Sequence, residues 1–382
     1  MSLTVLPRGA AALVLLASLA LLASSVPALD RTVKTTAGPL RIETLASGLN
    51  HPWGLAYLPD GRMLVTERPG RLRLVARDGT VSQPLRGVPK VFAVGSQAGL
   101  LDVAIDPKFK DNRLVYLSYA EQGPGGASTA VARAELADGG LQDAQVIFRQ
   151  TPRVDGPNHW GSRLVFARDG TLFVTLGERF KFAVAQDLSN TLGKIVRINP
   201  DGSIPKDNPF IGKEGARPEI WSYGHRNVEG AAIHPETGVL WADEMGPLGG
   251  DELNIPEAGK NYGWPVVSWG SHYDGRTIPK PPTRPDLAGS IYHWNPVISP
   301  SGMAFYTADA IPAWKGSLLI GGLSAHALVR LSLVGQKVTD EERIPMGARI
   351  RDVRQAPDGS IHLLTDEYNG KILHVLPEQR GT

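Results

Sequence analysis

The chain has 382 residues, of which 42% are hydrophobic and 20% charged, a composition typical of a soluble globular protein. Its formal net charge of +2 gives no reason to expect nucleic acid or an anionic membrane surface as a partner. There is no cysteine, which excludes disulfides, thiolate-bound clusters and covalently attached c-type haem. A cofactor for electron transfer would therefore have to be of another kind.

Residues 1–28 have the layout of a secretory signal peptide. One Arg precedes the apolar stretch AALVLLASLALLASS, and VPA follows with small residues at the cleavage positions. We predict cleavage after Ala28 and export to the periplasm. The alternative is an uncleaved N-terminal anchor, because the apolar run is about long enough to span a bilayer. We expect no membrane span in the mature chain.

One pattern recurs six times in the rest of the chain: an apolar pair, a turn with Pro, Asp or Gly, and a β-rich run. The copies lie at 55–68, 103–120, 164–179, 231–244, 303–322 and 353–367. Each copy predicts a β-hairpin whose turn residue adopts positive φ. Repeats at roughly such intervals of 50–70 residues indicate a propeller.

Residues 29–382 are therefore predicted to form one all-β domain, a six-bladed β-propeller of four-stranded antiparallel blades. A pair of β-sandwiches is the alternative, but it does not explain one turn formula repeated six times. Long loops rich in Gly, Trp and charge are expected to gather on one face of the propeller, where function usually lies.

The loop GPNHWGSRLVF carries the best single candidate for a general base, His159. An unperturbed imidazole titrates near neutrality, which suits proton abstraction. Asn158 and Arg163 are expected to orient the imidazole or a substrate. The alternative is a loop histidine that is hydrogen-bonded to backbone.

Two arginine motifs point to an anionic or carbonyl ligand. In WSYGHRNVEG, Arg226 and Asn227 offer fixed donors to a carbonyl or carboxylate; the alternative is an Arg226–Glu229 ion pair. In ARIRDV, residues 349 and 351 are both Arg and face the same way along a strand, which predicts a polyanionic ligand between them. The alternative is a solvated strand edge with Asp352 as partner.

The loop at 243–265, DEMGPLGGDELNIPEAGKNYGWP, combines acids with Gly and Pro. Hard cations such as Ca²⁺ take carboxylate and backbone carbonyl ligands, and this loop supplies both. The chain has no Walker-type phosphate loop, no GxGxxG dinucleotide motif, no GxSxG elbow and no paired histidines at zinc spacing.

These residues resemble the soluble quinoprotein sugar dehydrogenases, the PQQ-dependent aldose and glucose/sorbosone dehydrogenases. The resemblance covers nearly the whole mature chain. It rests on GLLDVAIDP, NHWGSRLVF, LGKIVRINPDGSIPKDNPF, WSYGHRNVEG, GGDELNIPEAGKNYGWP and RIRDV. It implies a six-bladed propeller that oxidises aldoses to lactones by hydride transfer to PQQ.

The resemblance also implies roles for individual residues. His159 looks like the base that removes the proton of the anomeric hydroxyl. The implied PQQ contacts are Gln97, Arg226, Asn227, Tyr273, Arg349 and Arg351. The carbonyls of Gly246 and Pro247 resemble ligands of the PQQ-bound Ca²⁺, and Glu252 with the carbonyl of Tyr262 resembles a second Ca²⁺ site. Ser324 stands, with His326 nearby, where family members often place a Lys that contacts PQQ, which puts that contact in doubt.

The expected partners are an aldose sugar and a separate electron acceptor, and the expected state is a monomer or weak homodimer. Two other functions stay open at this point. One is a Ca²⁺-dependent hydrolase acting on lactones, which is an analogy of fold alone. The other is a non-catalytic binding propeller with a vestigial pocket.

Overall fold

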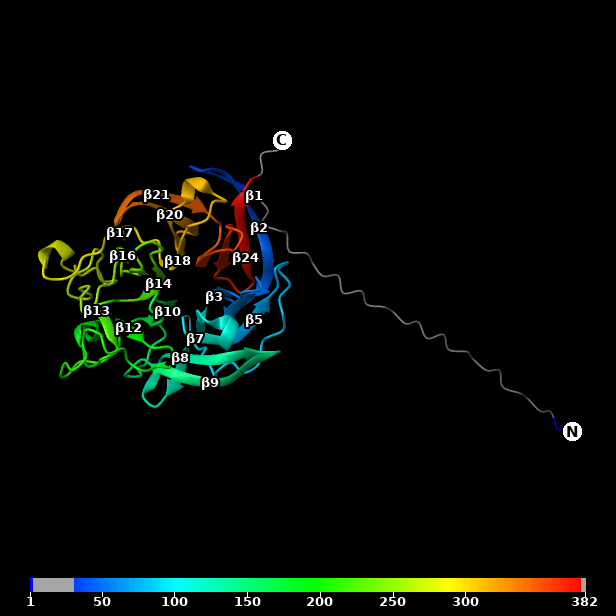
Figure 1. Cartoon of the computed structure of the whole chain (residues 1–382), viewed down its shortest axis with the longest axis horizontal. Helices are drawn as coiled ribbons and strands as arrows, with labels where there is room; N and C mark the ends of the chain where they lie inside the picture. The colour runs from blue at the N-terminus through cyan, green and yellow to red at the C-terminus, as the bar shows by residue number, and fades with distance from the viewer. Residues whose placement is uncertain (3–30, 96, 379–382) are drawn as a thin grey trace.

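The computed structural model describes residues 1–2, 31–95 and 97–378, so the predicted signal peptide lies outside the described residues after its second position. The described strands form six sheets arranged around a central axis (Figure 1). This arrangement confirms the predicted six-bladed propeller.

The first blade comprises β3 (Pro52–Tyr57), β4 (Met63–Glu67) and β5 (Arg71–Val75). The second comprises β6 (Leu100–Ile105), β7 (Leu114–Gly123), β8 (Gly126–Ala137) and β9 (Gly140–Arg149). The third comprises β10 (Gly161–Phe166), β11 (Leu172–Leu176), β12 (Lys194–Ile198) and β13 (Ile220–Tyr223).

The fourth blade comprises β14 (Val228–Ile233), β15 (Leu240–Glu244), β16 (Asp251–Asn254) and β17 (Tyr292–Trp294). The fifth comprises β18 (Pro300–Phe305), β19 (Leu318–Gly322), β20 (Ala327–Val334) and β21 (Lys337–Pro345). The sixth comprises β22 (Ile350–Gln355), β23 (Ile361–Thr365), β24 (Gly370–Pro377), β2 (Gly38–Leu49) and β1 (Arg31–Thr35). The short helical segments are α1 (Phe109–Asn112), η1 (Phe182–Gln186), η2 (Pro281–Thr283) and η3 (Pro312–Trp314).

Each of the six predicted hairpins forms the innermost strand and the second strand of one blade. The turns work because glycine adopts the left-handed conformation that closes them, with φ of +85° at Gly61, Gly170 and Gly359. The recurring Asp-Gly pattern therefore marks the part of every blade that faces the axis.

The hydrophobic core lies between neighbouring blades rather than inside any one of them. In one cluster, Tyr116 and Val131 of the second blade pack against Leu164, Leu172 and Val174 of the third. All five side chains are at most 5% exposed. Such contacts repeat around the ring, so each blade depends on its neighbours for burial of its apolar faces.

The ring closes inside the sixth blade, which combines strands from both ends of the chain (Figure 1). β2 pairs with β24 in antiparallel register from Leu40↔Pro377 to Leu49↔Gly370. Beyond these strands, the Thr32 hydroxyl donates a 3.0 Å hydrogen bond to the Glu378 carboxylate. Strand pairing between residues more than three hundred positions apart thus fixes the last blade to the first.

Among the described residues, no helix has the length and apolar character needed to cross a membrane.

Candidate functional site

A cavity of about 260 Å³ lies on the axis, at the end where all six innermost strands begin. It is lined by Trp53, Arg68, Gln97, Leu101, Trp160, Gly161, Glu229, Met245, Ser299, Leu323, Arg349, Arg351 and Asp366. Because these residues come from every blade or the loops just before one, the propeller as a whole shapes the cavity.

His159 lies two residues before β10, beside the cavity residues Trp160 and Gly161, and is 5% exposed. Its Nδ1 is 3.0 Å from the Glu178 carboxylate, which is itself fully buried, and its ring is 5.0 Å from the ring of Phe180. Burial lowers the pKa of His159, and the hydrogen bond to Glu178 opposes that effect. The imidazole is therefore neutral at pH 7 with Nδ1 committed to Glu178, which leaves Nε2 as the free base.

Gln97 and Asn227 position the backbone around His159. The Gln97 side-chain oxygen accepts a 2.7 Å hydrogen bond from the His159 amide, and the Asn227 oxygen accepts one of 3.0 Å from the amide of Gly161. His159 has a φ of +57°, a conformation that non-glycine residues adopt infrequently. The side-chain amides of Gln97 and Asn227 thus hold the backbone in a strained conformation that fixes the orientation of the imidazole.

Arg226 is 2% exposed and bridges the loop that follows β15. Its guanidinium donates to the carbonyls of Met245 and Gly246 at 2.9 and 2.6 Å and to the Tyr273 hydroxyl at 3.2 Å. Its Nε is buried and has no hydrogen-bond partner among the residues that the structure describes. The alternative of an Arg226–Glu229 ion pair is wrong, because Glu229 bonds to other residues.

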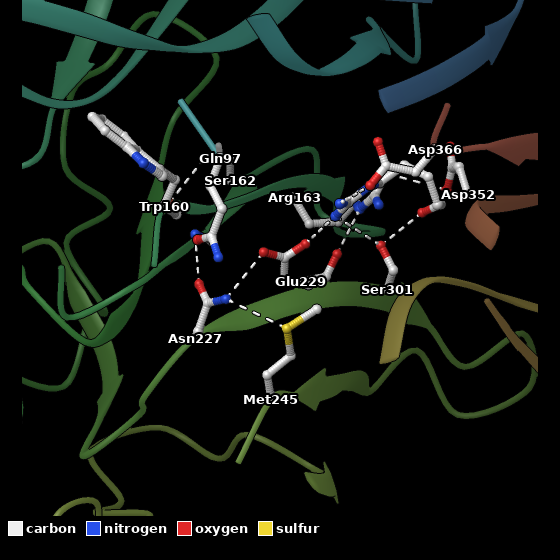
Figure 2. A network of polar contacts seen from close by, with 12 residues as sticks. Gln97, Trp160, Ser162, Arg163, Asn227, Glu229, Met245, Ser301, Asp352 and Asp366 are labelled. Atoms are coloured by element: carbon white, nitrogen blue, oxygen red, sulfur yellow. Dashed lines mark hydrogen bonds and ion pairs between the residues drawn. The ribbon is translucent and has the colours of Figure 1, made fainter. Parts of the chain in front are cut away.

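Glu229 joins the two halves of the polar network drawn in Figure 2. One carboxylate oxygen accepts a 3.0 Å hydrogen bond from the Asn227 side chain, and the other lies 2.5 Å from the Arg351 guanidinium. A single acid therefore links the asparagine near the base to the arginines at the other side of the cavity.

Asp366 is the carboxylate on which the arginine side of the cavity converges. Arg351 approaches it at 2.9 Å, Arg349 at 3.3 Å, Arg68 at 3.6 Å, and the Nδ1 of His51 at 3.0 Å. Burial acts to raise the pKa of Asp366, but the charge of Arg351 and these contacts outweigh it and hold that pKa well below its usual range. The anion between Arg349 and Arg351 is therefore in part a side chain of the protein, and the alternative partner Asp352 is wrong.

Arg163 is not beside His159, so its predicted orienting role is wrong. Strand β10 carries it down the axis, where it is fully buried and lies 3.0 Å from Asp102 and 3.2 Å from Asp352. Its ion pairs connect β10 to the inner strands β6 and β22, and Figure 2 shows Arg163 and Asp352 in the polar network. Asn158 also contributes its backbone carbonyl, to Arg179, rather than its side chain.

The four predicted calcium ligands, Gly246, Pro247, Glu252 and Tyr262, line one small cavity of about 10 Å³ together with Arg226 and Glu244. That volume holds a single water or ion. Burial raises the pKa of Glu252 well above its usual range, and the nearby charge of Glu244 adds to the rise. A cation would offset both effects, so the donor set fits a hard cation.

Among residues 31–95 and 97–378, no group of three or more His, Cys, Asp or Glu is placed to hold a metal. A cation in this small cavity would therefore need backbone carbonyls as well as carboxylates. One such oxygen, that of Gly246, already accepts a hydrogen bond from Arg226.

Two predicted cofactor contacts, Tyr273 and Ser324, do not line the cavity. Tyr273 is 62% exposed, and its hydroxyl accepts the hydrogen bond from Arg226. Ser324 is exposed, and its hydroxyl lies 3.5 Å from the carbonyl of Val297. Its neighbour Leu323 lines the cavity and Ser324 does not, so this position provides no charge to the cavity.

Sequence reasoning missed Glu178, Glu229, Asp366 and Arg68. Arg68, Glu178 and Asp366 follow the end of a second strand, in the units TER, GER and TDE, and Glu229 lies near the start of an inner strand. A comparison of the repeats position by position would have shown that charged residues recur after the second strand in the first, third and sixth blades.

The site is thus an arginine-rich cavity with a buried His–Glu pair at the mouth of a six-bladed propeller. The sequence model of the Glucose / Sorbosone dehydrogenase family matches residues 49–374. The chain belongs to this family and is an oxidoreductase.

Relatives cover nearly the whole chain. Aldose sugar dehydrogenase YliI of Escherichia coli strain K12 is 47% identical over 347 residues, which are 88% of this chain and 93% of that protein. The apo crystal structure of the soluble aldose sugar dehydrogenase from Escherichia coli is 45% identical and has a TM-score of 0.86, over 89% of this chain and 100% of that one. The PQQ-bound aldose sugar dehydrogenase of Streptomyces coelicolor is 29% identical with a TM-score of 0.72, over 88% and 98%.

Proposed function

We propose that the protein oxidises aldose sugars at the anomeric carbon to lactones, with PQQ as cofactor and His159 as general base. The observation that carries the proposal is the neutral, buried imidazole of His159, held by Glu178 at the edge of an arginine-rich cavity. The relatives support it, because one is an aldose sugar dehydrogenase and another was solved with PQQ bound.

The residues of the cavity fit a planar quinone that carries three carboxylates. Two buried guanidinium nitrogens, Nε of Arg226 and Nε of Arg351, have no hydrogen-bond partner within the described part of the chain. Gln97, Arg349 and Arg351 line the cavity, where the two arginines would hold carboxylates. Arg226 and Asn227 do not line it but hydrogen-bond to the lining residues Met245, Gly161 and Glu229, and together with Tyr273 they would lie beside the quinone. PQQ, when bound, supplies an electrophilic quinone carbon that accepts a hydride.

A Ca²⁺ ion in the small cavity beside Arg226 belongs to the same proposal. The carbonyls of Gly246 and Pro247, the Glu252 carboxylate and the carbonyl of Tyr262 would hold it. A cation there polarises neighbouring oxygens and compensates buried carboxylates. The resemblance implies two calcium sites, one at Gly246 and Pro247 and one at Glu252 and Tyr262, whereas all four residues line this one small cavity.

His159 would take the proton of the anomeric hydroxyl. Its Nδ1–H donates to Glu178, so the proton enters at Nε2 and the imidazolium is stabilised by the carboxylate behind it. The exposed rings of Phe180 and Tyr273 lie nearly parallel with centroids 6.4 Å apart, and they would offer aromatic faces to the C–H faces of a sugar ring.

The electrons would leave to a separate acceptor, because the chain has no cysteine for a cluster or c-type haem. We also propose a periplasmic location after removal of residues 1–28, and a monomer or weak homodimer as the working state. The apolar N-terminal sequence with its small-residue cleavage positions supports the location.

The experiment is to titrate the purified protein with PQQ in the presence of Ca²⁺ and then offer a panel of aldoses with an electron-accepting dye. Sugar-dependent dye reduction that requires both PQQ and Ca²⁺ is expected. Protein that binds PQQ but reduces no dye with any aldose would contradict the proposed reaction. Lactone hydrolysis without PQQ would instead indicate a hydrolase, and absence of PQQ binding a non-catalytic propeller.

Substitution of His159 tests the base directly. We expect His159→Asn to lower kcat by a factor on the order of 10² or more, because the proton acceptor is gone. Asn tolerates positive φ better than Ala does, so the backbone strain at this position stays similar. PQQ affinity, measured by absorbance titration, should remain close to that of the wild type. Wild-type turnover in His159→Asn would rule out this role.

A further inference from the structure

Arg68 enters the cavity from the first blade, directly after β4. Its amide donates to the carbonyl of His51 at 3.1 Å, and its carbonyl accepts from the amide of Leu100 at 3.0 Å. Gly99 lies against its carbonyl and its Cγ, so closely that any side chain at position 99 would collide with both. The backbone and stem of Arg68 are therefore held in one place, with the side chain lining the cavity.

The guanidinium of Arg68 has no hydrogen-bond acceptor within the described part of the chain. Its only ion pair there is with Asp366, at 3.6 Å from Nη1. That carboxylate already accepts hydrogen bonds from His51, Arg349 and Arg351. Arg68 thus has free donors on a side chain that is only 17% exposed.

The charges that line the cavity do not balance. Three arginines, at positions 68, 349 and 351, face two carboxylates, Asp366 and Glu229, so three positive charges less two negative ones leave one positive charge. Burial lowers the pKa of Arg68, whereas the pKa of Arg351, which is paired with both carboxylates, is raised. Arg351 lies 2.5 and 2.9 Å from the two carboxylates and Arg349 lies 3.3 Å from Asp366, whereas Arg68 reaches Asp366 only at 3.6 Å, so Arg68 is the least compensated of the three charges.

A planar guanidinium with free donors in a cavity is suited to a ligand carboxylate, which it can bind through two parallel hydrogen bonds. We propose that Arg68 is a third anion-binding residue of the cavity and receives a carboxylate of the bound cofactor. This inference rests on the proposed PQQ chemistry. It supplies from the first blade the positive charge that Ser324, on the fifth, does not provide.

The test is PQQ titration of the full-length protein with Ca²⁺, followed by quenching of tryptophan fluorescence. Arg68→Gln keeps the length of the side chain and removes its charge. We expect it to weaken PQQ binding roughly 10- to 100-fold, the usual loss for a charge-assisted hydrogen bond. Arg68→Lys should recover part of that loss. Arg62→Gln, on an exposed Arg62–Asp60 pair of the same blade, is the matched control and should bind like the wild type.

A second probe separates this inference from the proposed function. Benzene-1,3,5-tricarboxylate has the carboxylates without the quinone, and its binding is measured by calorimetry on apo-protein. Binding by the wild type that is lost in Arg68→Gln supports the anion site even if PQQ does not bind. The inference about Arg68 is overturned if wild type and Arg68→Gln bind each ligand with affinities that agree within twofold. It is also overturned if the wild type binds neither PQQ nor benzene-1,3,5-tricarboxylate.

Folding is checked by the thermal midpoint of the unliganded proteins. If Arg68→Gln does not fold, the comparison uses Arg68→Lys, which keeps the charge but not the planar fork. A reduced affinity for both probes in Arg68→Lys would then support the inference, and unchanged affinity for both would overturn it.

Discussion

His159 is held by residues from two other parts of the ring. Glu178 approaches its Nδ1 from the end of β11, and Gln97 accepts its amide hydrogen from the loop between the first two blades. Glu178 in turn accepts a 3.1 Å hydrogen bond from the amide of Lys181. The carboxylate is thus fixed before it fixes the imidazole, which makes Glu178 a positioning residue for the proposed base.

We expect Glu178→Gln to lower kcat by roughly 10²-fold, because the imidazolium loses its counter-charge and the ring loses its fixed tautomer. The pH profile gives the sharper test. Activity requires neutral His159 and falls as pH drops through its pKa. Glu178 raises that pKa against the effect of burial, so its removal should move the acid limb to lower pH.

The control is Glu342→Gln. Glu342 lies on β21, the outermost strand of the fifth blade, and its carboxylate accepts hydrogen bonds from Thr36. Its acid limb should match that of the wild type. An acid limb that stays fixed or moves to higher pH in Glu178→Gln would mean that Glu178 does not act through the pKa of His159.

The position of a residue at the cavity was predictable where the residue stands in a loop that leads into an inner strand. It was less predictable where the strand carries the residue away from the cavity. His159, Arg226, Asn227 and Arg351 stand in short motifs just before or at the start of inner strands, so the sequence placed them together. Arg163 is only four residues from His159. Four residues of extended strand span about 13 Å, which carries its guanidinium away from His159 to its buried partner Asp102. Partners such as Asp366 could not be predicted, because nothing in the local sequence distinguishes them from other acidic residues and their role depends on tertiary contacts.

In the first three blades, a hydroxyl side chain on the second strand connects that strand to the innermost strand of the following blade. Thr66 of β4 donates to the carbonyl of Leu101, Ser118 of β7 to that of Ser162, and Thr175 of β11 to that of Val228. All three hydroxyl residues are fully buried. These bonds satisfy carbonyls that the strand ladders leave free where the inner strands bulge.

Thr175→Val keeps the shape of the side chain and removes the bond to the carbonyl of Val228 together with the 2.9 Å hydrogen bond that the Thr175 hydroxyl accepts from the amide of Arg163. We expect the free energy of unfolding to fall by about 1–3 kcal/mol, because the carbonyl of Val228 is left buried without this donor. Denaturant unfolding measures the change. Thr339→Val removes a comparable hydroxyl-to-carbonyl bond of 3.2 Å on the exposed strand β21 and is expected to have little effect. Equal losses in the two variants would contradict the argument.

Hairpins were predictable from the repeated turns because Asp-Gly chemistry is local. The outer strands were less so. β9, β13, β17 and β21 have no common turn formula. In the described part of the first blade, β5 is followed by no regular fourth strand, and residues 81–85 pair with it through an isolated bridge and two backbone hydrogen bonds. The extra strand β1 joins the sixth blade through pairing with β2, which no local pattern in the sequence indicates.

At the scale of the whole molecule, stability depends on closure of the sixth blade. Ile42 of β2 is 1% exposed and packs with Val375 of β24 and with Ile344 of the fifth blade. We expect Ile42→Ala to cost about 2–5 kcal/mol, the usual loss for a buried aliphatic side chain. Because every blade relies on its neighbours for burial, Ile42→Ala should unfold in a single thermal transition whose midpoint is lower than that of the wild type.

Arg41→Ala, next to it on the same strand, is the matched control, since Arg41 is 47% exposed in its side chain. It should leave the thermal midpoint nearly unchanged. Separate melting of the sixth blade in Ile42→Ala, with the rest of the ring intact, would show that closure does not couple the blades.

The contact between Thr32 and Glu378 has a consequence for how the chain could be rearranged. The first and last described strands lie in one blade with their ends in contact. The cavity should therefore not depend on which blade comes first in the chain. A circular permutant, joined across this contact and opened at the exposed turn before β21, should assemble the same six inner-strand ends around the axis. The cavity belongs to the ring and not to any one starting point along it.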